Sequence, residues 1–288
     1  PIPTMTVTSP APYCPSDLIS ATDYNITTDP VGTVTYTWTA TNNAATGMAS
    51  TGTGAAPATP YNAPANATLI NQLSIITYTP SLAGCVGSAV TETVTIKPTP
   101  VIDPITSVTY CPNQVTNQIN FSCQPTGQGT PNYNWIITTS PYDVGLTPPT
   151  GTQSFVPSFT TNANNTGLAQ AAVVTLGASL NNCPSTFSNF SIIVNPTPVP
   201  KFSATNHVCE GQAMSFTDSS TPNTGSITVN TWAWDMDNDG NIDFSTKNPT
   251  YTYPAGSAGT IPVTLYVGTS SAPSCTAQVT EPVFVNPN

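Results

Sequence analysis

The feature that most constrains the fold of this 288-residue chain is a repeat of about one hundred residues. Each unit opens with a cysteine, carries an aromatic-x-Trp triplet about 24 residues later, and has another cysteine near its end. The opening cysteines lie 97 and 98 residues apart. Three anchors in constant order indicate three copies of one structural module. The anchors are Cys14, Tyr36-Thr37-Trp38 and Cys85; Cys111, Tyr133-Asn134-Trp135 and Cys183; and Cys209, Trp232-Ala233-Trp234 and Cys275.

Each unit ends in an alternating apolar segment followed by a proline, and these stops set the domain boundaries. Pro98-Thr99-Pro100 and the proline-rich segment 196–200 follow the first two units. Because proline fixes φ and removes a backbone donor, we expect short, semi-rigid and extended linkers. The predicted domains are residues 1–98, 99–197 and 198–288, each long enough for one sandwich core.

Short period-2 segments separated by Gly, Pro, Asn and Ser predict an all-β fold. The third unit is the clearest, with expected strands at 213–217, 231–234, 251–253, 263–267 and 283–285. This pattern is typical of an antiparallel β-sandwich. The sequence therefore predicts three tandem antiparallel β-sandwiches in an extended rod. In the first unit, the Ala/Thr/Gly-rich stretch at about 41–67 is expected to be a long connection or a mobile edge.

Composition excludes several classes of protein. The formal net charge is −10, and the chain has three lysines and no arginine, which argues against binding to nucleic acid or to anionic membranes. Only 6% of residues are charged, but 38% are hydrophobic and fall in alternating runs, which favours strands over disorder. No apolar run is long enough to span a bilayer. The opening residues Pro1-Ile2-Pro3 resemble a linker, so we expect a segment of a longer protein.

Six of the seven cysteines are expected to form disulfides. Pairing within each unit gives spans of 71, 72 and 66 residues, and similar spans at equivalent positions favour one bridge used three times. The predicted bridges are Cys14–Cys85, Cys111–Cys183 and Cys209–Cys275. Zinc is the alternative, but no unit has CxxC spacing or a histidine cluster. Disulfides predict an oxidising, extracellular compartment.

Cys123 is left over from this scheme. It shares strand parity with Ile119 and Phe121, so its side chain is expected to point into the core of the second unit. The alternative is a reactive or intermolecular thiol.

One acidic segment has the spacing of a metal site. Asp235, Asp237 and Asp239 occupy ligand positions 1, 3 and 5 of an oxygen-ligated loop, and Gly240 permits a sharp turn. The backbone carbonyl of Asn241 falls at position 7 and Asp243 at position 9. These five oxygen donors predict a structural Ca²⁺ site in the third domain: Asp235, Asp237, Asp239, Asn241 and Asp243.

The acidic segment is not an EF-hand, because Thr246 stands where the bidentate Glu would be. Water, backbone or a distant acid such as Asp218 is expected to complete the shell. The alternative is a solvated acidic turn without metal.

No catalytic constellation can be assembled, and we expect this segment not to be an enzyme. His207 is the only histidine and lies in a linker before Cys209, so it has no role as a base. The aspartate cluster could imitate a glycosidase pair, but its spacing fits a metal better. Trp38, Trp135 and Trp234 are expected in the cores. The alternative is that these rings form a carbohydrate-stacking platform. Trp232 and Trp234 share strand parity, so the pattern does not separate their positions.

The third unit resembles the PKD domain, in the variety found in secreted proteins of Bacteroidota. The family's Trp-Asp-x-Gly-Asp-Gly turn is expanded here to the segment 234–240. The first two units resemble PKD-like repeats through the aromatic-x-Trp triplet, the late cysteine and the Pro-Thr-Pro exits, but they lack the acidic turn. The resemblance of the third unit rests on Cys209-Glu210-Gly211-Gln212, Phe216-Thr217-Asp218-Ser219-Ser220, Trp234-Asp235, Asn248-Pro249-Thr250-Tyr251-Thr252-Tyr253, Val263-Thr264-Leu265-Tyr266-Val267 and Cys275.

The resemblance implies immunoglobulin-like sandwiches, as found in giant adhesins, gliding-associated surface proteins and the spacers of secreted hydrolases. We therefore expect a stalk or filament segment of a cell-surface adhesin outside the bacterial outer membrane, which spaces or presents adhesive regions. Its expected partners are further repeats of the same chain. Surface glycans or proteins and self-association into a fibre are left open. The alternative is a carbohydrate- or protein-binding accessory module of a secreted hydrolase.

Overall fold

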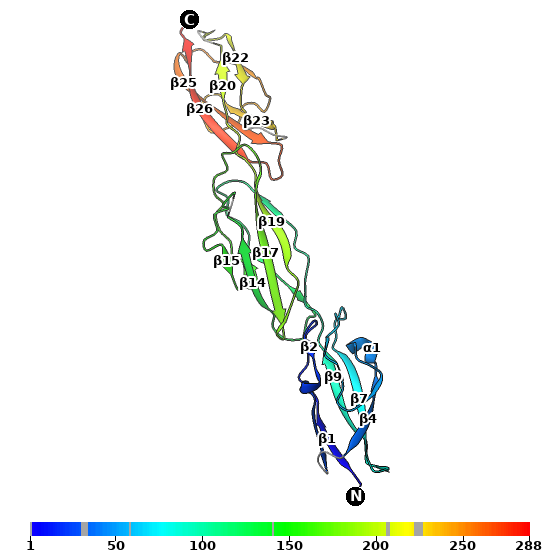
Figure 1. Cartoon of the computed structure of the whole chain (residues 1–288). Coiled ribbons are helices and arrows are strands. Elements are labelled where there is room, and N and C mark those ends of the chain that lie inside the picture. Colours follow the sequence, from blue (N-terminus) through cyan, green and yellow to red (C-terminus); the bar gives the residue numbers. More distant parts are fainter. Residues whose placement is uncertain (1, 30–33, 58, 140, 206–207, 222–226) are drawn as a thin grey trace.

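The computed structural model of the chain is an extended rod of three β-sandwich modules joined end to end, with the two termini at opposite ends (Figure 1). The prediction of tandem antiparallel sandwiches is confirmed. Among the described residues, no helix is long and apolar enough to cross a membrane. The structure describes residues 2–29, 34–57, 59–139, 141–205, 208–221 and 227–288.

The first module has a main sheet in the order β5-β4-β7-β9, with β8 paired to β7. Two short ladders, β1-β3 and β2-β6, form the other layer. A 3₁₀ turn η1 (Ala21–Asp23) and a short helix α1 (Asn43–Thr46) lie in the connections. The strands are β1 (Thr4–Thr8), β2 (Leu18–Ile19), β3 (Asn25–Asp29), β4 (Thr35–Thr41), β5 (Thr51–Thr53), β6 (Tyr61–Asn62), β7 (Gln72–Leu82), β8 (Cys85–Val86) and β9 (Val90–Ile96).

The second module repeats this plan. Its main sheet has the order β15-β14-β17-β19-β11, with β18 paired to β17, and β10-β13 and β12-β16 form the facing ladders. The strands are β10 (Val101–Ile102), β11 (Val108–Tyr110), β12 (Ile119–Asn120), β13 (Cys123–Gln124), β14 (Asn132–Ile137), β15 (Thr150–Gly151), β16 (Phe155–Val156), β17 (Gln170–Leu180), β18 (Cys183–Pro184) and β19 (Ser188–Val194).

The third module pairs a main sheet β23-β25-β26-β21 with a facing sheet β20-β22-β24. All five of its expected strands are found, several of them longer than expected. The strands are β20 (Phe202–Ala204), β21 (Val208–Cys209), β22 (Ala213–Asp218), β23 (Val229–Asp235), β24 (Thr250–Thr252), β25 (Gly259–Thr269) and β26 (Thr276–Asn286).

Each module encloses its own apolar core, and no core mixes residues from two modules. Alternation along the strands produces these cores: β7 and β17 turn every second side chain inward, and β25 contributes Val263, Leu265 and Val267 to its core. The Ala/Thr/Gly-rich stretch near 41–67 is a long connection that contains α1, β5 and β6. Part of it is packed, because Thr46, Met48 and Ala63 are buried.

The register of the main sheet defines two poles in each module. In the first module, β7 begins at Gln72 opposite Ile96 and ends at Leu82 opposite Cys85. We call the end with the β7–β8 turn the hairpin pole. The opposite end, where the chain leaves β9, is the exit pole, and Tyr13 lies there in a parallel bridge with Ile96. The second and third modules have the same poles. Their hairpin poles hold Cys183 and Cys275, and their exit poles hold Cys111 and Cys209.

Candidate functional sites at the module junctions and in the acidic turn

Two disulfides cross the junctions between modules. Cys14 of the first module is bonded to Cys183 of the second, with Cα atoms 5.2 Å apart. Cys111 of the second module is bonded to Cys275 of the third, with Cα atoms 5.4 Å apart. Both distances are ordinary for a disulfide. Each bond joins the exit pole of one module to the hairpin pole of the next.

The predicted pairing within each unit, Cys14–Cys85, Cys111–Cys183 and Cys209–Cys275, is therefore wrong. The physical reason is the length of the central strand. Cys14 and Cys85 lie at opposite ends of β7, which has 11 residues. At about 3.3 Å per residue this separates them by roughly 33 Å. A disulfide requires Cα atoms within about 7 Å, so neither cysteine can reach the other.

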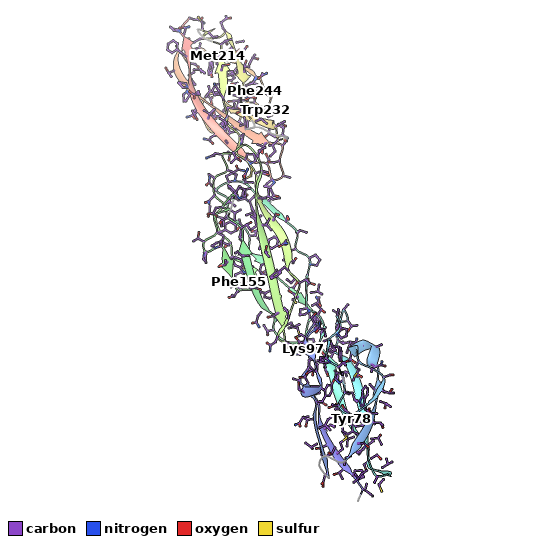
Figure 2. The ribbon with its side chains drawn as sticks, viewed as in Figure 1. Tyr78, Lys97, Phe155, Met214, Trp232 and Phe244 are labelled. Carbon is purple, nitrogen blue, oxygen red and sulfur yellow. A yellow bond between two sulfur atoms is a disulfide. The ribbon has the colours of Figure 1, made fainter. Side chains whose placement is uncertain are left out.

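A hydrogen bond accompanies the disulfide at each junction. Lys97, at the junction of the first two modules in Figure 2, donates from Nζ to the carbonyl oxygen of Asn181 at 2.9 Å. Asn195 donates from Nδ2 to the carbonyl oxygen of Pro273 at 3.3 Å. Both donors directly follow the last strand of a module, and both acceptors lie two residues before the late cysteine of the next. The two junctions therefore have one common geometry.

Three cysteines are free thiols: Cys85, Cys123 and Cys209. Cys85 is exposed in the hairpin pole of the first module, and Cys209 is partly exposed in the exit pole of the third. Their expected participation in disulfides within a module is excluded by the same pole-to-pole separation.

Cys123 is buried in the core of the second module, as its strand parity predicts. Burial raises the pKa of its thiol. Cys123 lies in β13 of the facing ladder, where it is paired with Ile102 of β10. Its sulfur lies 3.4 Å from the carbonyl oxygen of Gln124. These features are those of a small apolar core residue with low reactivity.

The acidic turn lies at the end of β23 and returns the chain toward β24. The backbone of Trp234 pairs with Phe244 through an isolated bridge, and this bridge closes the turn. Asn238 and Gly240 adopt positive φ angles of 58° and 88°, which allow the chain to reverse tightly. The expanded Trp-Asp turn is thus an ordered hairpin connection.

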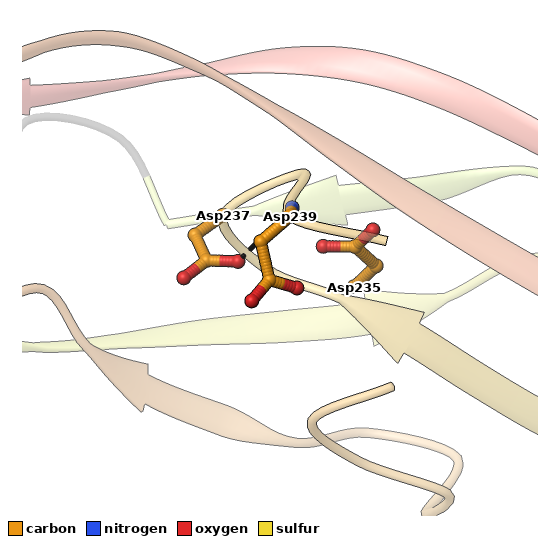
Figure 3. A group of neighbouring side chains, drawn as sticks. All are labelled: Asp235, Asp237 and Asp239. Atoms are coloured by element: carbon orange, nitrogen blue, oxygen red, sulfur yellow. Dashed lines mark hydrogen bonds between the residues drawn. The ribbon is translucent and has the colours of Figure 1, made fainter. Parts of the chain in front are cut away.

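Three of the five predicted metal ligands converge in this turn. Asp235, Asp237 and Asp239 each offer a carboxylate oxygen within 4.8 Å of the others, and Figure 3 shows the three side chains grouped together. Asp237 and Asp239 are exposed, whereas Asp235 is 2% exposed. Hydrogen bonds from the Asn241 side chain and backbone hold the pKa of Asp239 below its ordinary value. Asp239 is therefore ionised at neutral pH.

The other predicted donors have different roles in this structure. Asp243 accepts a hydrogen bond from the backbone N–H of Met236 at 2.7 Å, so it shapes the turn. Asn241 donates from its backbone and side chain to Asp239. Asp218 accepts from the Trp232 indole N–H at 2.9 Å and from the backbone of Ser220. The structure thus separates a compact group of three aspartates from the acids around it.

One atom in this group suits a bound cation. Asp235 Oδ2 accepts a hydrogen bond from the backbone N–H of Gly240, but its Oδ1 is buried and has no hydrogen-bond partner among the residues that the structure describes. A buried carboxylate oxygen without a partner is costly, because it has lost its hydration. An oxygen-only donor set of this kind fits the preference of Ca²⁺.

The tryptophans resolve the alternative between core and binding platform. Trp38, Trp135 and Trp234 are 4%, 4% and 0% exposed, so the prediction of core positions is confirmed. Trp232, which shares the parity of Trp234, lies at the edge of the core, and the Lys247 ammonium lies 5.7 Å from the centroid of its ring. Trp38, Trp135 and Trp234 therefore do not form the exposed aromatic platform that the alternative requires.

Sequence reasoning missed two repeated features. A glycine lies beneath each of the first two tryptophans, Gly52 opposite Trp38 and Gly151 opposite Trp135. A buried asparagine, Asn66 or Asn164, also ties a loop to the last strand. The period of 98 residues that relates the two asparagines was available as a signal, because both stand in an Asn-x-Thr sequence.

Comparison with known families adds one finding. Residues 195–283 match the family model described as the PKD domain. The chain thus contains a PKD domain. This match covers the third module and the linker before it, so membership of the first two modules in PKD-like repeats stays a prediction. PKD and immunoglobulin-like domains are typical extracellular modules and are generally non-catalytic. No curated protein sequence matches the chain.

Solved structures with similar folds include domain arrays. The PKD1 domain of Vibrio anguillarum Epp is 24% identical, covers 33% of this chain and 99% of its own, and has a TM-score of 0.27. The titin I-band fragment I67–I69 is 10% identical over 99% of this chain and 98% of its own, with a TM-score of 0.46. Mouse cadherin-23 EC22–24 is 12% identical over 100% and 99%, with a TM-score of 0.33. These likenesses concern the fold alone.

Proposed function

We propose that this segment is a stiff extracellular spacer, the stalk or filament part of a cell-surface adhesin that holds adhesive regions away from the cell. The observation that supports it is the covalent bond across each module junction, with a hydrogen bond beside it. A junction held only by a linker leaves neighbouring domains free to reorient. A second covalent link beside the linker restricts bending and rotation at the junction, and stiffness is the property that a spacer requires.

The location follows from the same bonds. Disulfides persist in oxidising compartments, and PKD domains are typical extracellular modules. We extend this proposal to the exterior of a bacterial outer membrane, and the resemblance to Bacteroidota surface proteins supports it. The segment has a structural rather than an enzymatic role in this proposal. The burial of Trp38, Trp135 and Trp234 removes the main support for the alternative of a carbohydrate-binding module.

Small-angle X-ray scattering tests the spacer function. The oxidised chain is expected to scatter as a straight rod, and the double variant Cys14→Ser, Cys111→Ser is expected to have a smaller radius of gyration because both junctions then bend. The variant Cys123→Ser is the control, since that thiol lies inside one core. Equal scattering profiles for the oxidised chain and the double variant would contradict stiffening by the disulfides.

We further propose that the acidic turn of the third module binds Ca²⁺, which stiffens the turn. The supporting observation is the buried, unpartnered Oδ1 of Asp235 beside two exposed carboxylates. A cation would supply the missing partner and offset the repulsion among the three charges. Asp235, Asp237 and Asp239 would hold it directly, and Asn241 and Asp243 would support the turn around it.

Calcium titration tests this site. At about 100 times the dissociation constant, Ca²⁺ should stabilise the third module by about 2.7 kcal/mol. The rise in its unfolding temperature is expected to disappear in Asp235→Asn. Glu281→Gln removes an exposed acid of the same module and should keep the full response. A solvated acidic turn without metal predicts no response to Ca²⁺ in any of the three proteins.

A further inference from the structure

Both junctions follow one rule of cysteine pairing. The opening cysteine of a module, at its exit pole, bonds to the late cysteine of the following module, at its hairpin pole. Three modules contain three opening and three late cysteines, but only two junctions. One late cysteine and one opening cysteine are therefore left over, and these are Cys85 and Cys209.

The two remaining cysteines lie at opposite ends of the rod. Cys85 occupies the hairpin pole of the first module, in the β7–β8 hairpin. Cys209 occupies the exit pole of the third, where β21 runs beside the end of β26. Each is the structural equivalent of a cysteine that is bonded elsewhere in the chain. Together they form the two complementary halves of a junction.

The exposure of the late cysteines also indicates that Cys85 lies on an uncovered half of a junction. Cys183 and Cys275 are 0% and 1% exposed, and each lies beside the exit pole of the preceding module. Cys85 has the same place in its hairpin but is exposed, as is Val86 beside it. The hairpin pole of the first module therefore presents the surface that a preceding exit pole covers in the other two.

The donor and acceptor positions of the junction hydrogen bond are also present at the two ends of the rod. Asn286 directly follows Val285 near the end of the last strand, in the position of Lys97 and Asn195. Ala83 lies two residues before Cys85, in the position of Asn181 and Pro273. An exit pole placed against this hairpin pole would bring the Asn286 amide toward the carbonyl oxygen of Ala83.

We propose that Cys209 and Cys85 are coupling thiols, each of which bonds to the complementary cysteine of a further module of this architecture. A second copy of this chain supplies both complements, so Cys209 of one copy bonds to Cys85 of a second copy through the same contact that joins the modules within the chain. This inference builds on the proposed spacer function, because it names the partner through which the spacer is prolonged. The contact is heterologous, since two different surfaces meet, and it leaves one of each free at the ends. Repetition yields an open fibre rather than a closed dimer.

The coupling reaction needs an oxidant, and a small-molecule disulfide such as glutathione disulfide suffices. The Cys209 thiolate attacks glutathione disulfide, forms a mixed disulfide and releases one glutathione thiolate. The Cys85 thiolate of the second copy then attacks the Cys209 sulfur and expels the other glutathione thiolate. Two protein thiols lose their two protons and two electrons, and one glutathione disulfide becomes two glutathione thiols.

Two complementary single variants test the coupling. Cys85→Ser keeps only the Cys209 end, and Cys209→Ser keeps only the Cys85 end. In a buffer of glutathione and glutathione disulfide, the mixture of the two is expected to yield a disulfide-linked dimer on a non-reducing gel, and peptide mass spectrometry should find the Cys209–Cys85 bond. Each variant alone is expected to lack the dimer. The unmodified chain is expected to form a ladder of longer species.

The outcome that overturns the proposal is equally specific. Dimers of Cys85→Ser with itself or of Cys209→Ser with itself, formed as readily as the mixed dimer, would mean that exposed thiols react without a docking geometry. Absence of any mixed dimer would also overturn it. Cys123→Ser should form the same ladder as the unmodified chain. The scattering comparison is made in the Cys85→Ser, Cys209→Ser background, which cannot couple, so the spacer function is judged separately.

Discussion

The first and second modules share their frame but differ at the centre of their cores. In both, a buried tryptophan of the main sheet lies over a glycine of the edge strand. At the next pair of core positions, Tyr78 donates a hydrogen bond to the buried carboxylate of Glu92 in the first module. The equivalent positions of the second module hold Leu176 and Phe190, both buried.

This difference separates what the repeat requires from what it tolerates. The central pair exchanges a polar contact for an apolar one while the strand register stays the same. The poles do not vary in this way, because the opening and late cysteines keep their places in all three modules. The repeat therefore requires its junction cysteines at fixed places, whereas the central pair of the core can be either polar or apolar.

The largest expected difference between the two modules appears under mechanical load. The shortest covalent path between the termini runs through both disulfides and through residues 1–14, 111–183 and 275–288. It includes most of the second module and bypasses the body of the first. At about 3.5 Å per residue, full extension should reach roughly 350 Å oxidised and roughly 1,000 Å reduced. Single-molecule pulling from the two termini measures both lengths.

Substitution of one cysteine should change which module bears the load. In Cys14→Ser the path includes residues 1–111, so the first module unfolds under force and the extension reaches about 440 Å. The variant Cys123→Ser should extend like the unmodified oxidised chain. Equal extensions for the oxidised and reduced chains would show that the bonds do not cross the junctions.

The buried asparagines provide the next largest effect and should act equally in both modules. Asn164 Nδ2 donates to the carbonyls of Leu168 and Val194, and Asn66 makes the same bonds to Ile70 and Ile96. Replacement by alanine removes the buried bond to the carbonyl of Ile96 or Val194, so we expect a loss of about 3 kcal/mol in either module. Hydrogen exchange resolved by peptide mass spectrometry measures the loss module by module.

The control for these variants is Gln170→Ala, which removes an exposed hydrogen bond to Thr166 in the same loop. It should cost less than about 0.5 kcal/mol. A large loss from Asn66→Ala with none from Asn164→Ala would break the comparison, because the two sites would then carry different weight.

The glycines beneath the tryptophans should give a smaller effect. A Cβ added at Gly52 or Gly151 would lie closer than 3 Å to the ring of Trp38 or Trp135. Because both rings are buried and cannot move freely, Gly52→Ala and Gly151→Ala should each destabilise their module by about 1–3 kcal/mol. Thermal unfolding followed by tryptophan fluorescence measures the effect.

Thr53→Ala, at an exposed position of the same strand as Gly52, serves as the control. It should change stability by less than about 0.5 kcal/mol. If Thr53→Ala and Gly52→Ala cost the same, strand propensity rather than contact with the ring would explain the loss.

The sequence alone predicted the sandwiches, the buried tryptophans and the core position of Cys123, because each depends on alternation along a strand. It failed on disulfide pairing for a physical reason. The repeat places each cysteine within its module but does not say at which pole it lies, and the similar spans of 71, 72 and 66 residues fitted a bridge within the module. Only the register of β7, which separates Cys14 from Cys85, decides the matter.

The acidic turn was predictable in part for a related reason. The spacing of Asp235, Asp237 and Asp239 identified the residues that converge. It could not show that Asp243 holds the backbone of Met236, or that Asp218 is engaged by Trp232. The first contact depends on the fold of the turn itself and the second on the position of Asp218 at the end of β22, and ligand spacing encodes neither.

The smallest predicted effect lies at the polar centre of the first module. Burial raises the pKa of Glu92 above its ordinary value of 4.5, so the folded state retains its proton to higher pH than the unfolded state. The stability of the first module should therefore be greatest below pH 4.5 and fall as pH rises through the folded pKa. Tyr24 and Tyr36 stay neutral over this range, because burial raises their pKa values as well.

Glu92→Gln should remove this pH dependence while it keeps an oxygen that accepts from Tyr78. At neutral pH the variant is expected to be more stable than the unmodified chain, by about 1.4 kcal/mol for each unit by which the pKa is raised. Below pH 4.5 the difference should vanish. Hydrogen exchange at several pH values follows the effect, with the second module as the internal reference because Phe190 cannot titrate there. A Glu92→Gln protein that is less stable at neutral pH would mean that the carboxylate, rather than the acid, suits this core.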